Sequence, residues 1–217
     1  MTKEKTKFTP ALEKATGEIK YNMTNDYMFR ALFQQNTVAL KGLLSSLLHM
    51  PPENILSVEI MNPIVIGETI NDKEFRLDIK AVLNHYQQIN LEMQVVNRHD
   101  WPERSIGYLS RMYNSLQKGD QYINVKPAIH VGILNFSPFE GEPIFYSRNV
   151  LMDMNKHRIY SDKFQVNVLE LKQIELATEE DKEWNLDFWA KLFKAGTWEE
   201  LKMIAKDNEY FTEASNT

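Results

Sequence analysis

The chain has 217 residues, of which 43% are hydrophobic and 11% aromatic, and it contains no cysteine. This composition supplies one ordinary buried core and excludes a disordered segment, and no apolar run approaches the roughly 20 residues that span a bilayer. The lack of cysteine excludes disulfides, thiolate metal sites and cysteine nucleophiles, and the charged start lacks the apolar region of a secretory signal, so we expect a cytoplasmic protein without a membrane partner.

The charge is unevenly distributed along the chain. The formal net charge of -5 argues mildly against a nucleic-acid partner. Residues 170–217, however, carry 12 acidic and 6 basic side chains, whereas residues 1–169 carry 18 acidic and 19 basic ones. The acidity therefore belongs to the C-terminal segment, and the rest of the chain is nearly balanced.

The first third of the chain predicts an arm, two helices and one β segment. Residues 1–20 resemble a loosely packed arm. A first helix should begin at Thr24 or Asn25, either of which can cap it. Its inward face is expected to carry four apolar side chains: Tyr27, Met28, Ala31 and Leu32. A second helix, 38–49, should stop before the prolines that follow, and a β segment at 55–61, with a continuation to Ile66 as an alternative, comes next.

The middle of the chain predicts two more β segments and a helix. The β segments are 75–84 and 88–96. Pro102 and Glu103 after Asp100 mark a helix start, and Gly119 should end that helix. The apolar residues that recur at helical spacing within it are Ile106, Leu109, Tyr113 and Leu116.

The remaining segments complete an α/β (α+β) pattern. Residues 128–136 predict a buried strand, 144–150 and 164–171 predict additional strands, and 179–206 predict two helices broken near Gly196. An aromatic cluster in the first of these helices indicates core, with a homodimer contact as the alternative: Trp184, Phe188, Trp189, Leu192 and Phe193. The core order of helix, three β segments, helix and β predicts a mixed sheet flanked by helices, with the last core strand beside the first.

The two central β segments carry the informative chemistry. Alternation places Phe75, Leu77, Ile79, Ala81 and Leu83 on one face of the first segment, and so puts Arg76, Asp78 and Lys80 on the other. In the second segment the apolar face is formed by Ile89, Leu91, Met93 and Val95. Glu92 and Gln94 then share the opposite face.

The expected hairpin brings these polar side chains together. A turn through residues 85–87 pairs Asn84 with Gln88, which places Asp78 opposite Gln94 and leaves Glu92 on the diagonal. Diagonal Cβ atoms lie about 7 to 8 Å apart, close enough for two carboxylates to share one cation. Acids in an apolar hairpin are costly unless they are paired or metal-bound, and hard oxygen ligands favour Mg²⁺ or Mn²⁺.

The same residues resemble the PD-(D/E)XK nuclease superfamily and, within it, the recombination-promoting nuclease and transposase family. The resemblance covers residues 21–136 and rests on NDYMFRALF, LDIK, INLEMQ and ERSIGYLSRMYNSLQKGDQY. It implies a restriction-endonuclease-like αβββαβ core within residues 21–175, preceded by the 1–20 arm and followed by an acidic helical extension over 176–217. It further implies a divalent-metal-dependent DNA endonuclease linked to recombination or a mobile element.

The resemblance assigns roles residue by residue. Asp78 and Glu92 correspond to the metal-binding acids, and the best match to an additional acid from the first helix is Asp26. Gln94 stands at the usual lysine position, and glutamine can orient water or phosphate but cannot deprotonate water. The alternative for Asp26 is an ion pair with Arg30 in the first helical turn.

A stripe of polar side chains on the helix after Pro102 agrees with a DNA partner. It consists of Arg104, Tyr108, Arg111, Ser115 and Lys118, at helical spacing, and could contact phosphates. Arg104 and Tyr108 also match the family pattern, which places them nearer the site. The alternative is a solvated helix face.

Other observations narrow the function classes. The five histidines show no ligand spacing, and His130, inside an apolar strand, is typical of a core residue. No phosphate-binding loop, dinucleotide motif or nucleophile elbow occurs. The alternatives to an endonuclease are a catalytically inactive nuclease-fold module that binds DNA or regulates, and a truncated form whose acidic C-terminal segment shields or mimics DNA.

Overall fold

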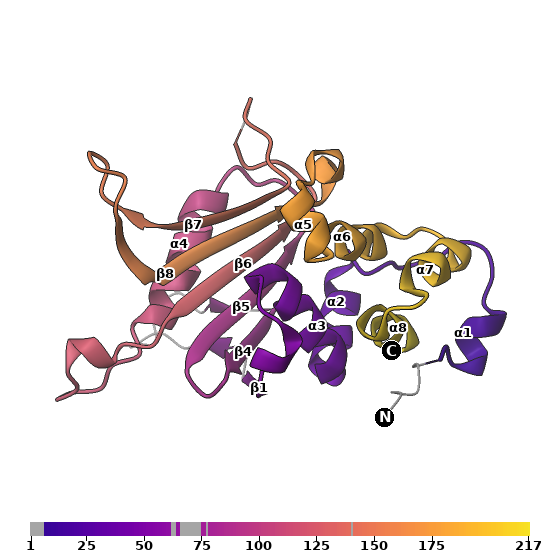
Figure 1. Cartoon of the computed structure of the whole chain (residues 1–217), viewed down its shortest axis with the longest axis horizontal. Helices are drawn as coiled ribbons and strands as arrows, with labels where there is room; N and C mark the ends of the chain where they lie inside the picture. The colour runs from indigo at the N-terminus through magenta and orange to yellow at the C-terminus, as the bar shows by residue number, and fades with distance from the viewer. Residues whose placement is uncertain (1–6, 62–63, 66–74, 77, 140) are drawn as a thin grey trace. The chain divides into compact units, whose positions relative to one another are not determined.

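The computed structural model describes residues 7–61, 64–65, 75–76, 78–139 and 141–217 (Figure 1). The chain forms two compact units, each described separately here. The sheet unit comprises Leu56–Gln173, and the helical unit combines Met1–Ile55 with Ile174–Thr217. The N-terminal helices therefore share a unit with the C-terminal helices. The expected division into 1–20, 21–175 and 176–217 stays a prediction. Among the described residues, no helix combines the length and apolar character that crossing a membrane requires.

The sheet unit is built on a six-stranded mixed sheet, the α/β architecture expected from the sequence and consistent with a restriction-endonuclease-like fold. Its strands, in spatial order, are β1 (Val58–Met61), β4 (Ile79–Leu83), β5 (Gln87–Gln94), β6 (Ala128–Leu134), β8 (Ile159–Glu170) and β7 (Tyr146–Met152). β1, β4 and β5 run antiparallel, β5, β6 and β8 are parallel, and β7 returns antiparallel to β8. A separate two-stranded sheet joins β2 (Ile64–Val65) to β3 (Phe75–Arg76).

The predicted neighbour of the last core strand was wrong. β6 pairs in parallel with β5, with Asn90 level with His130, whereas β1 is an edge strand that β4 and β5 separate from β6. All seven residues of β6 are buried, as a strand covered on both faces should be. The buried-strand prediction for 128–136 is therefore confirmed, and the adjacency follows from the parallel crossover that α4 (Trp101–Tyr113) provides between β5 and β6.

The β4–β5 hairpin turns one residue earlier than predicted. Asn84 and His85 both have positive φ angles, and the N–H of Tyr86 donates to the carbonyl of Leu83, as a type I′ turn requires. Leu83 consequently pairs with Gln87, and Ile79 pairs with Leu91, so the register differs from the predicted one by two residues. A shift of two leaves every side chain on its predicted face. The alternation is confirmed for Ile79–Leu83, while Leu77 and the continuation to Ile66 lie outside the described residues.

Helix α4 packs against β6 and β8 and, in Figure 1, runs behind them. Its buried residues are Trp101, Ser105, Tyr108, Leu109 and Met112. The predicted helix was too long, because the structure ends it at Tyr113 with Asn114 as the C-cap, six residues before Gly119. The predicted inward face was also rotated, since Ile106 is 52% exposed while Tyr108 is buried. The inward face is rotated because α4 packs on polar residues of the sheet. Tyr108 stacks on His130, and Arg104 pairs with Glu92.

The helical unit contains α1 (Pro10–Lys14), α2 (Asp26–Gln35), α3 (Thr37–Leu48), α5 (Glu179–Glu183), α6 (Leu186–Lys194), α7 (Trp198–Ala205) and α8 (Glu209–Asn216). Asn25 caps α2 as predicted by accepting from the N–H groups of Tyr27 and Met28. The expected break near Gly196 separates α6 from α7, and a second break at Asn185, with φ 59°, separates α5 from α6. Helix α1 forms within the segment that was expected to be an arm.

An aromatic core stabilises the helical unit. Phe29, Phe33, Trp189 and Phe193 are buried and in mutual ring contact. Trp189, Leu192 and Phe193 are therefore core, as the sequence indicated. The predicted inward face of α2 was wrong for Tyr27 and Met28, which are 72% and 38% exposed, because Phe29 and Phe33 occupy the core instead.

Candidate active site

Asp78 and Glu92 meet at one end of the β4–β5 hairpin. Ile79 pairs with Leu91, so Asp78, one residue before β4, comes level with Glu92 rather than with Gln94 as predicted. The Asp78 carboxylate then accepts the backbone N–H of Met93 at 2.9 Å. This hydrogen bond fixes the Asp78 carboxylate beside the main chain that carries Glu92.

Glu92 is buried and ion-paired. Its side chain is 6% exposed, and its Oε1 accepts from Nε of Arg104 at 2.7 Å. A carboxylate in such surroundings is tolerated because a cation and hydrogen bonds accompany it. Burial by itself would lower the pKa of Arg104, but the charge of Glu92 and its hydrogen bond raise that pKa overall, so the pair is strongly ionic. The sequence placed Arg104 near the site only through the family pattern, and the structure gives it a partner.

A row of polar side chains runs beneath α4. Gln88 and Asn90 share the buried face of β5 with Glu92, and His130 lies level with Asn90 on β6. Gln88 donates to the carbonyl of Met112, and the Asn90 amide nitrogen lies 2.9 Å from Nδ1 of His130. The predicted polar face of the hairpin is thus an interior layer and not a solvated one.

His130 is fully enclosed. Burial, and then the nearby charge of Arg104, lower the pKa of His130 to about 3, so the ring is neutral near pH 7. Its Nε2 lies 3.6 Å from Oε2 of Glu92. The sequence correctly indicated a core position for His130 but gave no sign of its contact with Glu92.

Tyr108 lies beside Arg104, and the charges of both acids act on its phenol. Burial raises the pKa of the Tyr108 phenol, and the charges of Glu92 and Asp78 raise it further, against the opposing effect of Arg104. The guanidinium of Arg104 lies 5.0 Å from the Tyr108 ring centroid. The charges of Asp78, Glu92 and Arg104 therefore all act on the Tyr108 phenol. These four residues form a polar centre between β5 and α4.

Gln94 and Lys80 lie at the edge of this centre. The Gln94 side-chain amide donates to the carbonyl of Val96 at 3.0 Å, and among the described residues no hydrogen bond reaches its buried Oε1. Lys80 pairs with Asn90 across the hairpin and points to the same face as Asp78, two residues before it. Burial lowers the pKa of Lys80. Alternation predicted Lys80 on this face but assigned it no role. Its position two residues after Asp78 could have indicated that it lies near the site.

Asp26 belongs to the helical unit. It is the first residue of α2, its side chain is 59% exposed, and its Oδ2 accepts from Arg30 at 2.8 Å. This is the helical ion pair that the sequence offered as the alternative to a metal ligand. Its role in binding a cation stays a prediction.

The predicted DNA-binding stripe is not continuous. Arg104 and Tyr108 are turned toward the sheet, and Tyr108 is buried. Ser115 and Lys118 follow the end of α4, so only Arg111 keeps the expected helical position with partial exposure. Arg104 and Tyr108 turn inward because Glu92 and His130 of the sheet are their partners. DNA binding by the residues of the stripe stays a prediction.

Asp78 and Glu92 offer carboxylate oxygens, the type of donor atom that a hard divalent cation prefers. Among the described residues no group of three histidine, cysteine or acidic side chains could hold a metal ion. Mg²⁺, however, is commonly held by one or two carboxylates with water and substrate phosphate completing its coordination. Asp78 and Glu92 supply such a pair, provided that Arg104 gives up part of its hold on Glu92.

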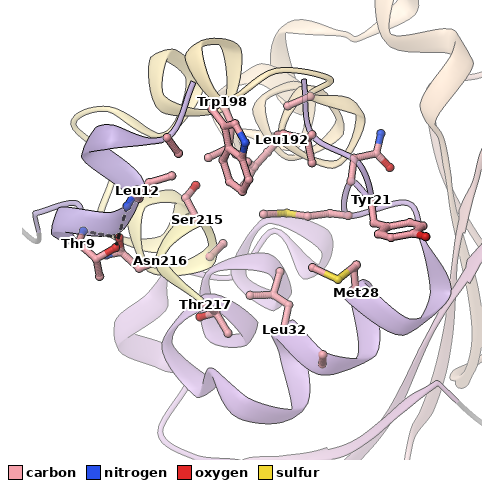
Figure 2. Close-up of a pocket in the computed structure, with 18 of the residues that line it drawn as sticks. Thr9, Leu12, Tyr21, Met28, Leu32, Leu192, Trp198, Ser215, Asn216 and Thr217 are labelled. Carbon is pink, nitrogen blue, oxygen red and sulfur yellow. Dashed lines mark hydrogen bonds between the residues drawn. The ribbon is translucent and has the colours of Figure 1, made fainter. Parts of the chain in front are cut away.

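A cavity in the helical unit has different chemistry. It measures about 510 Å³ and is lined mainly by apolar side chains of α1, α2, α6, α7 and α8, with Thr9 bonded to Asn216 at its rim (Figure 2). None of its described lining residues has an acidic or basic side chain. A cavity of about 240 Å³ in the sheet unit lies beside Trp101 and Ser105 and is also apolar. The acids of the hairpin therefore remain the candidate active site.

A sequence model of the family described as PD-(D/E)XK nuclease family transposase matches residues 23–217. The match covers the hairpin acids, α4, the parallel strands and the C-terminal helices. No curated protein and no solved structure matches the chain.

Proposed function

The chain belongs to the PD-(D/E)XK nuclease family transposases, and from this membership we propose that it is a metal-dependent endonuclease that hydrolyses phosphodiester bonds in DNA. The family gives a nuclease or transposase role with DNA as substrate. The metal dependence, the catalytic residues and an action in recombination or mobile-element transfer are our proposal.

The observation that carries the proposal is the convergence of Asp78 and Glu92. The hairpin register sets Asp78 level with Glu92, and the Asp78 carboxylate accepts from the backbone N–H of Met93, the residue next to Glu92. Maintaining two acids in a largely buried layer costs free energy, which is offset only by cations and hydrogen bonds. Such an arrangement is typical of a site whose acids have a chemical task.

Asp78 and Glu92 would hold Mg²⁺ or Mn²⁺. Such an ion lowers the pKa of a bound water and neutralises developing charge on the phosphate. Asp26 as an additional ligand stays a prediction from the family resemblance. Arg111 and Lys118 are kept as proposed phosphate contacts.

Arg104 has two tasks in this proposal. It neutralises Glu92 in the present structure through the 2.7 Å hydrogen bond. With a cation beside Glu92 in place of Arg104, the planar guanidinium would be available for phosphate oxygens, which it can contact in a bidentate way. The Arg104–Glu92 pair thus keeps the site folded without a cation and supplies a phosphate-binding group with one.

Gln94 and Lys80 together would replace the usual lysine. Gln94 can orient water or phosphate by hydrogen bonding, but it carries no charge. Lys80, on the same face of the hairpin, supplies a positive charge two residues after Asp78. Its half-buried position lets that charge act on a phosphate with little screening.

A second candidate function is a non-catalytic DNA-binding or regulatory module. Gln94 at the lysine position and the occupation of Glu92 by Arg104 favour it. Calorimetric titration with Mn²⁺ discriminates the two, because a module without a metal site gives no saturable heat that Glu92→Ala removes.

Nicking of a supercoiled plasmid tests the leading proposal. Wild-type protein with Mg²⁺ or Mn²⁺ should nick DNA, whereas Asp78→Ala and Glu92→Ala should not. Glu103→Ala is the matched control, since Glu103 is an exposed acid adjacent to Arg104. Equal activity of all four proteins would show that the site has been wrongly assigned.

A further inference from the structure

His130 contacts the candidate site from inside the sheet. It lies on β6, is 0% exposed, and faces α4 together with Glu92. A buried histidine in the middle of a parallel strand is costly unless its ring nitrogens are used. The contacts of this ring therefore call for an explanation.

Two rings of α4 hold the imidazole in place. The Tyr108 ring stacks on it with centroids 5.6 Å apart and planes 4° apart, and Trp101 stacks at 5.5 Å and 29°. Gly132, two residues along β6, makes room for Trp101, because a Cβ there would overlap the indole ring. The His130 ring thus has little freedom to turn.

Asn90 determines which nitrogen of His130 carries the proton. Its amide nitrogen can only donate, so Nδ1 of His130 accepts the 2.9 Å hydrogen bond. The neutral ring then carries its proton on Nε2, which lies 3.6 Å from Oε2 of Glu92, slightly longer than a hydrogen bond. The reverse assignment would set two acceptors against each other at this distance.

From this geometry we propose that His130 is a positioning residue for Glu92, holding Oε2 through its Nε2–H while Oε1 exchanges Arg104 for a divalent cation. The proposal rests on the proposed metal-dependent function. It gives the two oxygens of one carboxylate different tasks: Oε1 changes partner, and Oε2 stays directed at the imidazole. Asn90 contributes by fixing the tautomer.

Titration calorimetry with Mn²⁺ alone tests the consequence for the cation. His130→Phe keeps an aromatic ring between Trp101 and Tyr108 but has no N–H, and should weaken Mn²⁺ binding about ten- to a hundredfold, as losses behind a ligand commonly do. His130→Gln, which can donate from its amide, should lose less. Leu109→Ala is the control, because Leu109 is fully buried in the same layer and should lose thermal stability but keep Mn²⁺ affinity. The proposal would be overturned if His130→Phe binds Mn²⁺ within roughly twofold of the wild-type affinity. If His130→Phe does not fold, His130→Gln replaces it in this test. An Mn²⁺ affinity of His130→Gln no higher than that of Glu92→Gln would then overturn the proposal.

Nitrogen NMR of the His130 ring in the protein without metal tests the contact itself. We expect the proton on Nε2 and a shift of that nitrogen in Glu92→Gln, a readout that packing alone does not produce. A proton on Nδ1, or a ring unaffected by Glu92→Gln, would overturn the positioning role even if the protein nicks DNA. If wild-type protein neither binds Mn²⁺ nor nicks DNA while the NMR result holds, the catalytic function fails and the His130–Glu92 contact stands.

Discussion

Arg104 donates from Nε to Oε1 of Glu92 over 2.7 Å, and the accepting carboxylate is 6% exposed. The polar face of β5 therefore lies against a helix, and that helix supplies the cation beside Glu92. The energetics of the sheet unit and the chemistry of the site depend on the same ion pair.

Arg104→Met should destabilise the fold by about 3 kcal/mol, because it leaves a buried carboxylate without the cation beside it. Glu92→Gln should cost less, since a neutral amide needs no counter-charge. The double variant Glu92→Gln with Arg104→Met should lose less than the sum of the two single losses. Urea denaturation measures all three, and additive losses in the double variant would contradict a coupled pair.

His130 should make the protein sensitive to acid. Burial and then the charge of Arg104 lower its folded-state pKa to about 3, below its ordinary value of 6.5. Between these values the unfolded state binds more protons, so the free energy of unfolding should rise with pH across this range and be fully gained above 6.5. Urea unfolding of wild type and His130→Phe from pH 4 to 7.5 checks this, and a slope unchanged by the substitution would contradict it.

Glu170 should act in the opposite direction. It is 4% exposed, and burial raises its pKa despite hydrogen bonds from Ser137 and the backbone of Ile144. The folded state then binds the proton more tightly, so the contribution of Glu170 to stability is present below its ordinary pKa and is lost as pH rises through the raised one. Glu170→Gln should therefore be more stable than wild type at pH 8 and lose that advantage near pH 4. Thermal unfolding at both pH values measures the difference, and a variant less stable at pH 8 would refute it.

Gly132→Ala should disturb the site through Trp101. An added Cβ would overlap the indole ring that stacks on His130. Overpacking of this kind costs about 1 to 3 kcal/mol. Gly196→Ala is the control, because nothing lies within 4 Å of a Cβ at that position. Equal unfolding midpoints for the two variants would show that the indole moves aside freely.

Local sequence patterns predicted the helices and strands. Only the structure shows which side chains of one element contact those of another. The alternation of β4 and the apolar run of β6 correctly gave strands and their buried faces. The burial of the polar face of β5 was not predicted, because no local pattern reveals that α4 supplies Arg104 as a partner for Glu92. The α4 face was predicted from apolar spacing alone, so Tyr108 was placed outward and Ile106 inward.

The candidate site was predictable in its residue types but not in its geometry. Asp78 and Glu92 were found from the motif, and the two-residue register error kept them on one face. The turn at Asn84 and His85 could not be placed from sequence because it requires positive φ at two residues other than glycine. His130 was missed as a site neighbour because its partners, Asn90 and Trp101, come from another strand and a helix.

Lys80 provides the sharpest test of how a nuclease site could work without lysine at position 94. A half-buried cation on the face of Asp78 can stabilise charge that develops on a phosphate, whereas Gln94 can only donate a hydrogen bond. Lys80→Met should therefore reduce the single-turnover nicking rate about a hundredfold, the scale of losing one transition-state contact. Mn²⁺ affinity should be unchanged or higher, because a positive charge near the acids is removed.

Lys126→Met is the control, since Lys126 is exposed in the same unit. Adding Gln94→Lys to Lys80→Met should restore part of the rate if a lysine at either position performs the same task, and equal rates for Lys80→Met and Lys126→Met would assign phosphate neutralisation to Arg104 instead.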